Sequence, residues 1–382
     1  GLYKIDRRLM NILINCSNLK AGGGLQVADS ICRELNRFKQ HHFVVILSSF
    51  FRETASAIAE YNNVEVKQYN VKNSVQTVVF GRDAFLDNEV KVRSIDVVLT
   101  VFGPSRWEPR CPHLCGFAKA FHVIPESPYY SRMGRFELLK NRMSNKIYEV
   151  FFQRKTKNFF TENPFITSRL QHLFKNANVY TITNYYNQVF DCPETWKRIE
   201  LPQFDGVTLL TISNSYPHKN LEIAVDVARI LKSCHSDFKF RFVMSITREQ
   251  MKTEINDVES NFLFLGTVDI SECPSLYSQC DIAFQPTLIE CFTAMYPEAM
   301  RMKKPIVTVD LEFAKGLCGE AACYYSAVDP ASAAEAIYRV ATDKEYSKSL
   351  VEKGETQLGK YDNYGQRADK LLTLLELIAE KK

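Results

Sequence analysis

The chain is predicted to be an α/β protein with two Rossmann-like, doubly wound domains facing across a cleft. Its 382 residues exceed the roughly 250 to 300 at which a single core usually stops growing. Short apolar strands alternate with helical stretches in both halves of the chain, which is the pattern of parallel sheets with helical crossovers. Between the halves, FDCPETWKRIELPQFDG (190–206) has few periodic apolar positions and is interpreted as a linker.

The front half begins with the strand MNILINC (10–16). Further strands are expected at 42–49, near 64–69, at 95–103 and at 179–184, with helices over about 25–38 and 53–61. Residues 129–160 carry eight Lys or Arg against two Glu, together with many aromatics. This composition predicts one long basic, amphipathic helix.

The back half starts the alternation again. Strands are expected at 207–213, 238–245, 262–266, 281–286, 305–310 and 322–326, and helices at 220–232, 248–259, 273–279, 293–302 and 331–342. The tail (344–382) is expected to be helical. The predicted domains are therefore 1–198, 199–365 and a C-terminal helix over 366–382 that packs back on the first domain.

Composition excludes several classes of protein. There is no signal-peptide pattern at the start and no apolar run of about 20 residues, so a cytoplasmic protein is expected. Eleven scattered cysteines, an odd number, argue against a disulfide framework. The cluster Cys111-Pro-His113-Leu-Cys115 offers at most three metal ligands, whereas structural zinc takes four. Structural cysteines and no bound metal are therefore expected.

Charge is divided unevenly between the halves. There are 28 Lys and Arg against 17 Asp and Glu through Arg198, and 20 against 27 after it. A basic front half favours an anionic partner, and nothing indicates nucleic acid. Residues 129–160 are a candidate for peripheral contact with the inner face of an anionic membrane, where they would meet a lipid-linked or growing glycan acceptor. The alternative is a helix that packs its aromatics into the front domain.

Three segments at predicted strand ends are candidates for ligand binding. The first is Ala21-Gly22-Gly23-Gly24, after the first strand. Glycines there let backbone amides of a helix N-terminus approach an anion, although a tight turn explains them equally well. The dinucleotide fingerprint GxGxxG is not matched, so an NAD site is not indicated.

The second segment is Ser213–Asn220, between the first strand and helix of the back half. Its Lys219 is placed to bind a phosphate, or is a solvated lysine of a loop. The third is ECFTAMYPE, with Glu290 and Glu298. If Thr293 begins the helix, Glu290 points into the cleft, and the free amides of Phe292 and Thr293 form an anion site.

The order of these segments resembles glycosyltransferase family 4, the retaining GT-B enzymes of the group 1 type. The stretches that carry the resemblance are AGGGLQVADSICREL, LLTISNSYPHKNLEIAVDVARIL, FLGTVDISECPSLYSQCDIAFQPTLIECFTAMYPEAMRMKKPIVTVD and GEAACYYSAVDPASAAEAI. They cover nearly the full chain, and those of the back half are the more specific.

The resemblance implies a role for each matching residue. Gly23 and Gly24 match a glycine pair near the reaction centre, and Lys219 matches the phosphate-binding lysine. Glu290 matches the glutamate at the donor sugar, beside the amides of Phe292 and Thr293. Glu298 matches the glutamate that holds the nucleotide ribose, the backbone of Thr267 and Val268 matches the turn at the nucleobase, and His122 matches a cleft histidine weakly.

The resemblance also implies the activity: transfer of a sugar from a nucleoside diphosphate sugar to a hydroxyl, with retention and without a metal, in polysaccharide, lipopolysaccharide or other glycoconjugate assembly. Three positions depart from the pattern. Asn214 stands where an arginine is usual, and Cys291 and Lys304 stand where glycines are usual. Because Asn214 lacks the positive charge of that arginine, His218 or Arg248 would then supply the charge that binds the phosphate. A non-catalytic GT-B scaffold and a sugar-nucleotide epimerase remain alternatives.

Overall fold

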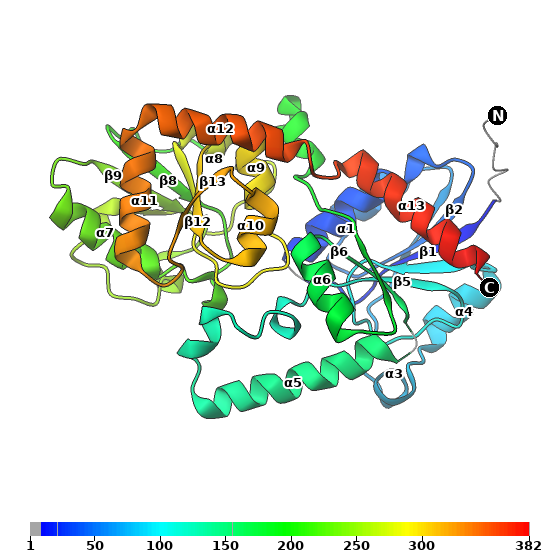
Figure 1. The fold of residues 1–382 in the computed structure, drawn as a ribbon. Coiled ribbons are helices and arrows are strands. Elements are labelled where there is room, and N and C mark those ends of the chain that lie inside the picture. The colour runs from blue at the N-terminus through cyan, green and yellow to red at the C-terminus, as the bar shows by residue number, and fades with distance from the viewer. Residues whose placement is uncertain (1–8, 21, 155, 382) are drawn as a thin grey trace, which may run out of the picture. The chain divides into compact units, whose positions relative to one another are not determined.

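The computed structural model describes residues 9–20, 22–154 and 156–381, and these form two compact units. Unit 1 comprises the described residues of Gly1–Val123, Leu139–Asn184 and Asn363–Lys382. Unit 2 comprises Ile124–Leu138 and Tyr185–Asp362. Figure 1 shows the chain as a ribbon coloured by residue number and labels many of its helices and strands. Each unit is a parallel sheet with helical crossovers, and together they confirm the predicted α/β class.

Unit 1 contains a sheet of seven strands in the order β3-β2-β1-β4-β5-β6-β7, all paired in parallel. The strands are β1 (Asn11–Cys16), β2 (His42–Leu47), β3 (Val64–Gln68), β4 (Val97–Thr100), β5 (His113–Gly116), β6 (Asn158–Thr161) and β7 (Asn178–Thr181). Its α-helices are α1 (Gly23–Arg33), α2 (Arg52–Ile58), α3 (Val75–Phe80), α4 (Ala84–Val92), α6 (Pro164–Leu173) and α13 (Tyr364–Glu380). The helix α5 (Arg135–Gln153) starts in the part of the chain assigned to unit 2 and continues in unit 1.

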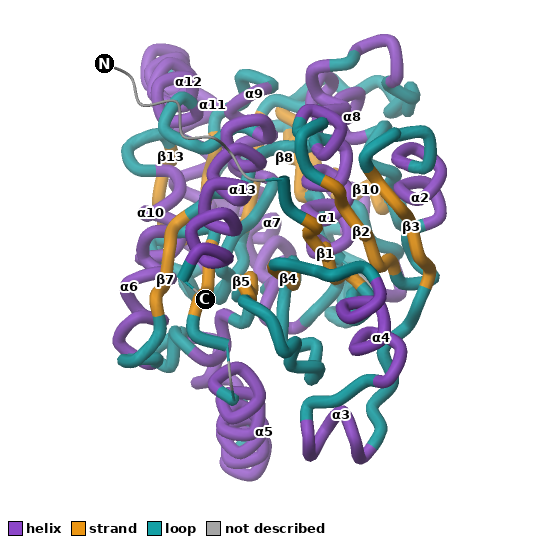
Figure 2. The backbone as a smooth tube through the Cα atoms, turned by 90° about the vertical axis from the view of Figure 1, so that its right-hand side faces the viewer, coloured by secondary structure: helices purple, strands orange, loops and turns teal. Residues whose placement is uncertain are grey.

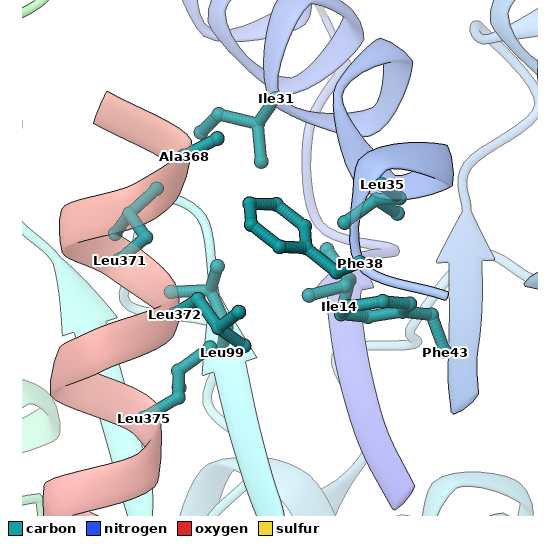
Figure 3. A pocket seen from close by; sticks show the side chains of 10 residues that line it. All are labelled: Ile14, Ile31, Leu35, Phe38, Phe43, Leu99, Ala368, Leu371, Leu372 and Leu375. Atoms are coloured by element: carbon teal, nitrogen blue, oxygen red, sulfur yellow. The ribbon is translucent and has the colours of Figure 1, made fainter. Parts of the chain in front are cut away.

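Strand β1 is buried on both faces, which explains why Ile12, Leu13 and Ile14 are apolar in succession rather than alternating with polar residues. Ile12 and Ile14 pack with α1 and α13 on one face, whereas Leu13 packs with Leu86 of α4 on the other. The C-terminal helix thus lies in the core of unit 1. A cavity of about 20 Å³ remains between α13, α1 and the sheet, and only apolar side chains line it (Figure 3). It has the dimensions of a packing defect.

Unit 2 contains a six-stranded parallel sheet in the order β10-β9-β8-β11-β12-β13. The strands are β8 (Val207–Thr211), β9 (Phe240–Met244), β10 (Phe262–Phe264), β11 (Ile282–Gln285), β12 (Ile306–Val309) and β13 (Ala322–Tyr325). The helices are α7 (Ile223–Cys234), α8 (Cys273–Gln279), α9 (Met295–Arg301), α10 (Glu312–Cys318), α11 (Pro330–Thr342) and α12 (Lys344–Leu358). The strand order reverses between β8 and β11, so the loops that follow these two strands meet at the carboxyl edge of the sheet.

Two helix predictions were wrong. Residues 248–259 form the 3-10 turn Arg248–Gln250 and otherwise no helix before Glu259, because the capping box of Thr247 and Gln250 closes a single turn. A single helix was expected over 129–160. The structure instead has three elements there: the 3-10 helix Pro128–Arg132, the helix α5 and the strand β6. Strand β6 was not predicted, because NFFT is too short to show a periodicity, and the residues of β5 were interpreted only as a cysteine cluster.

The expected linker 190–206 is held against α8. Lys197 N donates to Ser271 O at 2.9 Å, and Ile199 N donates to Ser275 Oγ at 3.2 Å. The chain passes from unit 1 to unit 2 earlier, between Asn184 and Tyr185, and returns between Asp362 and Asn363. This segment has few periodic apolar residues because hydrogen bonds of its backbone hold it in place, and it needs no apolar face to do so.

Candidate functional site

The loops after β8 and β11 bring Lys219 and Glu290 into direct contact, although 71 positions separate them in the sequence. The first loop ends in the 3-10 helix Pro217–Lys219, with proline at its first position and Asn220 in the left-handed conformation as its cap. Asparagine tolerates this conformation better than most residues. The buried Asn220 side chain donates to Pro286 O at 3.3 Å and so joins the two loops.

Glu290 has a polar environment built from both loops. Its Oε1 is in contact with Lys219 Nζ and accepts a hydrogen bond of 3.0 Å from Thr287 Oγ1. His218 Nε2 lies 3.9 Å from the same oxygen. The main chain fixes the arrangement, since Leu288 N donates to His218 O at 2.9 Å. The structure thus brings together three of the predicted donor-binding residues: His218, Lys219 and Glu290.

His218 does not replace the charge of an arginine. Burial lowers its pKa to about 4, with the Glu290 carboxylate acting in the opposite direction, so the imidazole is neutral near pH 7. Arg248, the other suggested replacement, forms an ion pair of 3.5 Å with Glu259 and donates to Met251 O. Asn214 is exposed in the loop after β8.

Glu298 lies in the first turn of α9 and is buried, with 5% of its surface exposed. Burial raises its pKa to about 7, although a hydrogen bond of 3.0 Å from the Tyr277 hydroxyl to Oε2 lowers it. Glu298 therefore changes charge near neutral pH. Tyr277, on α8, was missed by the sequence analysis, because nothing in SLYSQ sets it apart from a core tyrosine.

The helix after β11 begins at Met295, two residues later than predicted. Thr293 is buried, and its Oγ1 accepts a hydrogen bond of 3.2 Å from Gln285 Nε2. Phe292 is half-buried and makes an edge-to-face contact with Tyr361. The segment from Glu290 to Thr293 is thus a loop, and Glu290 lies outside the helix, as predicted.

Thr267 and Val268 follow β10 at the same carboxyl edge, two strands away from β8. They come after Gly266, whose φ of +71° lies in the left-handed region. Thr267 is exposed and Val268 is half-buried. The structure places them on the same edge as the pair of Lys219 and Glu290.

A segment from the front half of the chain, Ile124–Leu138, packs on this edge of unit 2; we call it the strap. Ser127 Oγ donates to Leu288 O at 2.7 Å, and the ring of Tyr129 contacts that of His218 edge to face. Arg132 forms an ion pair of 3.0 Å with Glu222. The sequence analysis missed the strap, since no local signal shows that these residues leave the front half.

In unit 1, Gly23 and Gly24 form the first turn of α1. No described heavy atom lies within 4 Å of a Cβ built at Gly23, and the nearest to one at Gly24 is in ordinary contact at 3.5 Å. The packing of unit 1 therefore does not require glycine at these positions.

His122 lies in unit 1 among the rings of Phe117, Tyr148 and Phe152. Burial lowers its pKa to about 4, and the charges of Lys119 and Lys146 lower it further. Its Nδ1 is buried without a hydrogen-bond partner among the described residues. An aromatic environment of this kind favours a neutral, packed histidine.

Metal ligands are not grouped in the described part of the chain, where no cluster of three or more His, Cys, Asp or Glu is placed to hold an ion. His113 of the cysteine cluster is buried, and its ring nitrogens lie 2.8 Å from the hydroxyls of Thr100 and Thr156. Every described cysteine is a free thiol.

The fold defined by the two units matches solved GT-B glycosyltransferases over nearly the whole chain. Sucrose-phosphate synthase from Thermosynechococcus elongatus has a TM-score of 0.70 at 13% identity, with 98% of this chain and 100% of that chain covered. A glycosyltransferase from Rickettsia africae has a TM-score of 0.69 at 13% identity, covering 98% and 100%. HepE from Anabaena, solved in complex with UDP and glucose, has a TM-score of 0.68 at 14% identity, covering 96% and 100%. The fold is therefore of the GT-B class.

A family model matches part of unit 2. Residues 206–343 match the group 1 glycosyl transferases, and this segment contains Lys219, Glu290 and Glu298. No match was found among the curated proteins. The stretch of unit 2 that carries the candidate site is thus similar to the group 1 glycosyl transferases.

Proposed function

We propose that the protein transfers a sugar from a nucleoside diphosphate sugar to a hydroxyl group of a glycan or lipid-linked acceptor. The observation that carries this proposal is the contact of Lys219 with Glu290 at the strand-order reversal of unit 2, where ligands of doubly wound sheets bind. The ammonium of Lys219 and the carboxylate of Glu290 lie side by side, and they match the two parts of such a donor, the diphosphate and the sugar. The ammonium can bind the diphosphate, and the carboxylate can accept hydrogen bonds from sugar hydroxyls.

In the proposed reaction, the bond between the anomeric carbon and the diphosphate oxygen breaks, and the oxygen keeps the electron pair. The acceptor oxygen bonds to the anomeric carbon on the same face, and its proton passes to the departing phosphate oxygen, so the configuration is retained. Lys219 stabilises the charge on the phosphate, while Glu290 orients the sugar and is not a nucleophile. No metal takes part in this proposal, and the neutral His218 supports the loop.

The remaining donor contacts are proposed from their places on the same edge of unit 2. Thr267 and Val268 would contact the base, and Glu298 the ribose. The HepE structure holds UDP, so uridine nucleotides are the first donors to test. Family 4 membership, a cytoplasmic location, and a role in polysaccharide or glycoconjugate assembly belong to the same proposal.

Donor screening tests the function. Thermal unfolding of the full chain with UDP-, GDP- and ADP-sugars should show a rise in midpoint for one nucleotide class, because a ligand that binds the folded state stabilises it. The stabilising donor should then release nucleoside diphosphate when acceptor extract is added, and the anomeric configuration of the product can be read by NMR.

Other outcomes distinguish the alternatives. Stabilisation without turnover indicates a non-catalytic scaffold, whereas a changed free sugar nucleotide without acceptor indicates an epimerase. If no nucleotide sugar stabilises the chain, the proposed function is wrong.

A further inference from the structure

We propose that α5 and α3 form a surface that binds an anionic lipid bilayer peripherally. This inference does not depend on the proposed sugar transfer. It rests on the outward face of α5, on the charges beside that face, and on an adjoining set of exposed apolar side chains in α3.

The outward face of α5 is apolar. Phe136, Leu139, Met143, Ile147 and Val150 are between 56% and 82% exposed. They are separated by three, four, four and three positions, which places them within an arc of about 80° at 100° per residue. We call these five residues the outer stripe. Isolated exposed apolar residues are common, but a continuous stripe along four turns indicates a binding surface.

The inward face of α5 shows that the outer stripe is not the core-facing side of an ordinary amphipathic helix. The inward positions are half-buried or buried: Leu138, Asn141, Asn145, Tyr148 and Phe152. Two of them are polar, and Asn145 Nδ2 donates to Phe121 O at 3.0 Å. The helix therefore meets its own protein through a partly polar face and turns its aliphatic face outward, the reverse of the usual arrangement.

Basic residues border the outer stripe. Helix α5 carries Arg135, Lys140, Arg142 and Lys146 against only Glu137 and Glu149. At 100° per residue, Lys140 and Lys146 lie roughly 60° to either side of the centre of the stripe, and both glutamates lie roughly 120° away from it. Lys146 Nζ forms an ion pair of 2.7 Å with Glu149, on the side away from the stripe. Lys140, Arg142 and Lys146 are exposed. An apolar strip with basic margins matches the interface between acyl chains and anionic headgroups.

Helix α3 extends this surface at the C-terminal end of α5. Val75, Val79 and Phe80 are exposed. Arg154, which follows α5, donates to Thr77 O at 3.2 Å and also bonds Val78 O, so the two helices are tied together. Figures 1 and 2 show α3 and α5 projecting from the same end of unit 1. Two neighbouring segments thus each expose apolar side chains.

A bilayer fits this surface better than a protein groove does. A protein groove that bound α5 would need to match its apolar face but not the basic residues on both sides of that face. An anionic bilayer matches both, because it offers an apolar interior and an extended anionic surface. None of the helices in the described ranges is long and apolar enough to cross a membrane, so the contact would be peripheral.

Co-sedimentation with vesicles tests the proposal. The full-length chain should pellet with vesicles of phosphatidylcholine mixed with phosphatidylglycerol, and not with phosphatidylcholine alone. Binding should weaken as salt is raised, because the basic residues act through a screened charge. Changing Met143, Ile147 and Val150 together to serine should lower the fraction bound about tenfold, since three apolar contacts with the bilayer are lost.

Two controls keep the result interpretable. Phe50→Ser and Leu377→Ser change apolar residues of unit 1 that are also exposed but lie outside the surface, and they should bind vesicles like the wild type. Circular dichroism and thermal unfolding should show that the triple variant is folded. The variant Lys140→Gln with Lys146→Gln should lose the preference for anionic vesicles.

Three results would overturn the proposal: failure of the wild type to bind anionic vesicles at physiological salt, equal binding by the triple variant, or equal binding to neutral vesicles. A fourth is a dimer, seen by light scattering, that the triple variant makes monomeric while vesicle binding is absent. That result would assign the outer stripe to a second copy of the chain.

Discussion

The hydroxyl of Tyr277 donates a hydrogen bond of 3.0 Å to Oε2 of the buried Glu298. This bond lowers the pKa of the carboxyl, but burial has the larger effect and the pKa is raised to about 7. If ionised Glu298 binds the ribose hydroxyls, donor affinity depends on this bond. Tyr277→Phe should move the pH at which donor affinity is half-maximal upward by about one unit, since a hydrogen bond to a carboxylate contributes about 1.5 kcal/mol. Isothermal titration with the stabilising donor between pH 6 and 9 measures the shift.

The matched control is Tyr361→Phe, which removes a buried hydroxyl that donates to Leu317 O at 2.6 Å in the same unit. It should leave the pH midpoint unchanged. An unchanged midpoint in Tyr277→Phe would show that Glu298 does not titrate with donor binding.

The raised pKa of Glu298 also predicts a stability profile. Between about pH 4.5 and 7 the folded state holds a proton that the unfolded state has lost, so the free energy of unfolding falls as pH rises through this range. The Glu298→Gln variant has no titrating group at this position. Its free energy of unfolding should therefore fall less over this pH range, by roughly 1.4 kcal/mol for each unit by which the pKa of Glu298 is raised. Urea unfolding at pH 5 and pH 8 measures both slopes, and parallel slopes would contradict the prediction.

Lys219→Ala should reduce kcat/KM for sugar transfer by roughly 100-fold, because the charge that develops on the leaving phosphate loses its cation. Lys239→Ala is the matched control. That exposed lysine of the same unit forms an ion pair of 3.0 Å with Asp205, away from both loops of the site. Steady-state rates with saturating acceptor are the measurement, and a rate within a few-fold of the wild type would remove Lys219 from the site.

Gly23→Ala should separate stability from activity. A methyl group at Gly23 meets no described atom within 4 Å, and alanine is a better helix former than glycine by about 1 kcal/mol. The thermal midpoint should therefore stay equal or rise, while donor binding or turnover falls because the methyl group occupies space that the ligand needs. A variant with full activity would mean that these glycines only make a turn.

Leu372→Ala should destabilise the protein by about 2 to 5 kcal/mol, as large-to-small changes in packed cores do. Leu372 is 4% exposed beside the small cavity under α13, whereas Leu377 of the same helix is 48% exposed. Leu377→Ala should change the free energy of unfolding by less than about 0.5 kcal/mol. Urea unfolding of both variants tests whether the C-terminal helix is part of the core of unit 1.

Local sequence patterns were enough to predict most strands of the two sheets, though not β5 and β6, and the loops that carry the site. Strands such as NILINC and FRFVM contain short apolar runs, ILI and FVM, and a serine follows each of these two strands. The segments with Lys219 and Glu290 could be assigned to strand ends for that reason. Their contact followed only once the sheet order placed β8 beside β11, because strand order depends on pairings between distant segments.

The sequence by itself thus determined the α/β class, the division into two similar halves and the candidate site loops. Those features depend on periodicity and on residues adjacent in the chain. Only the tertiary structure decided that the strap packs on unit 2, that Tyr277 reaches Glu298, and that the apolar side of α5 faces outward. The physical reason is that an amphipathic pattern defines two faces of a helix, while long-range packing selects which of them is buried.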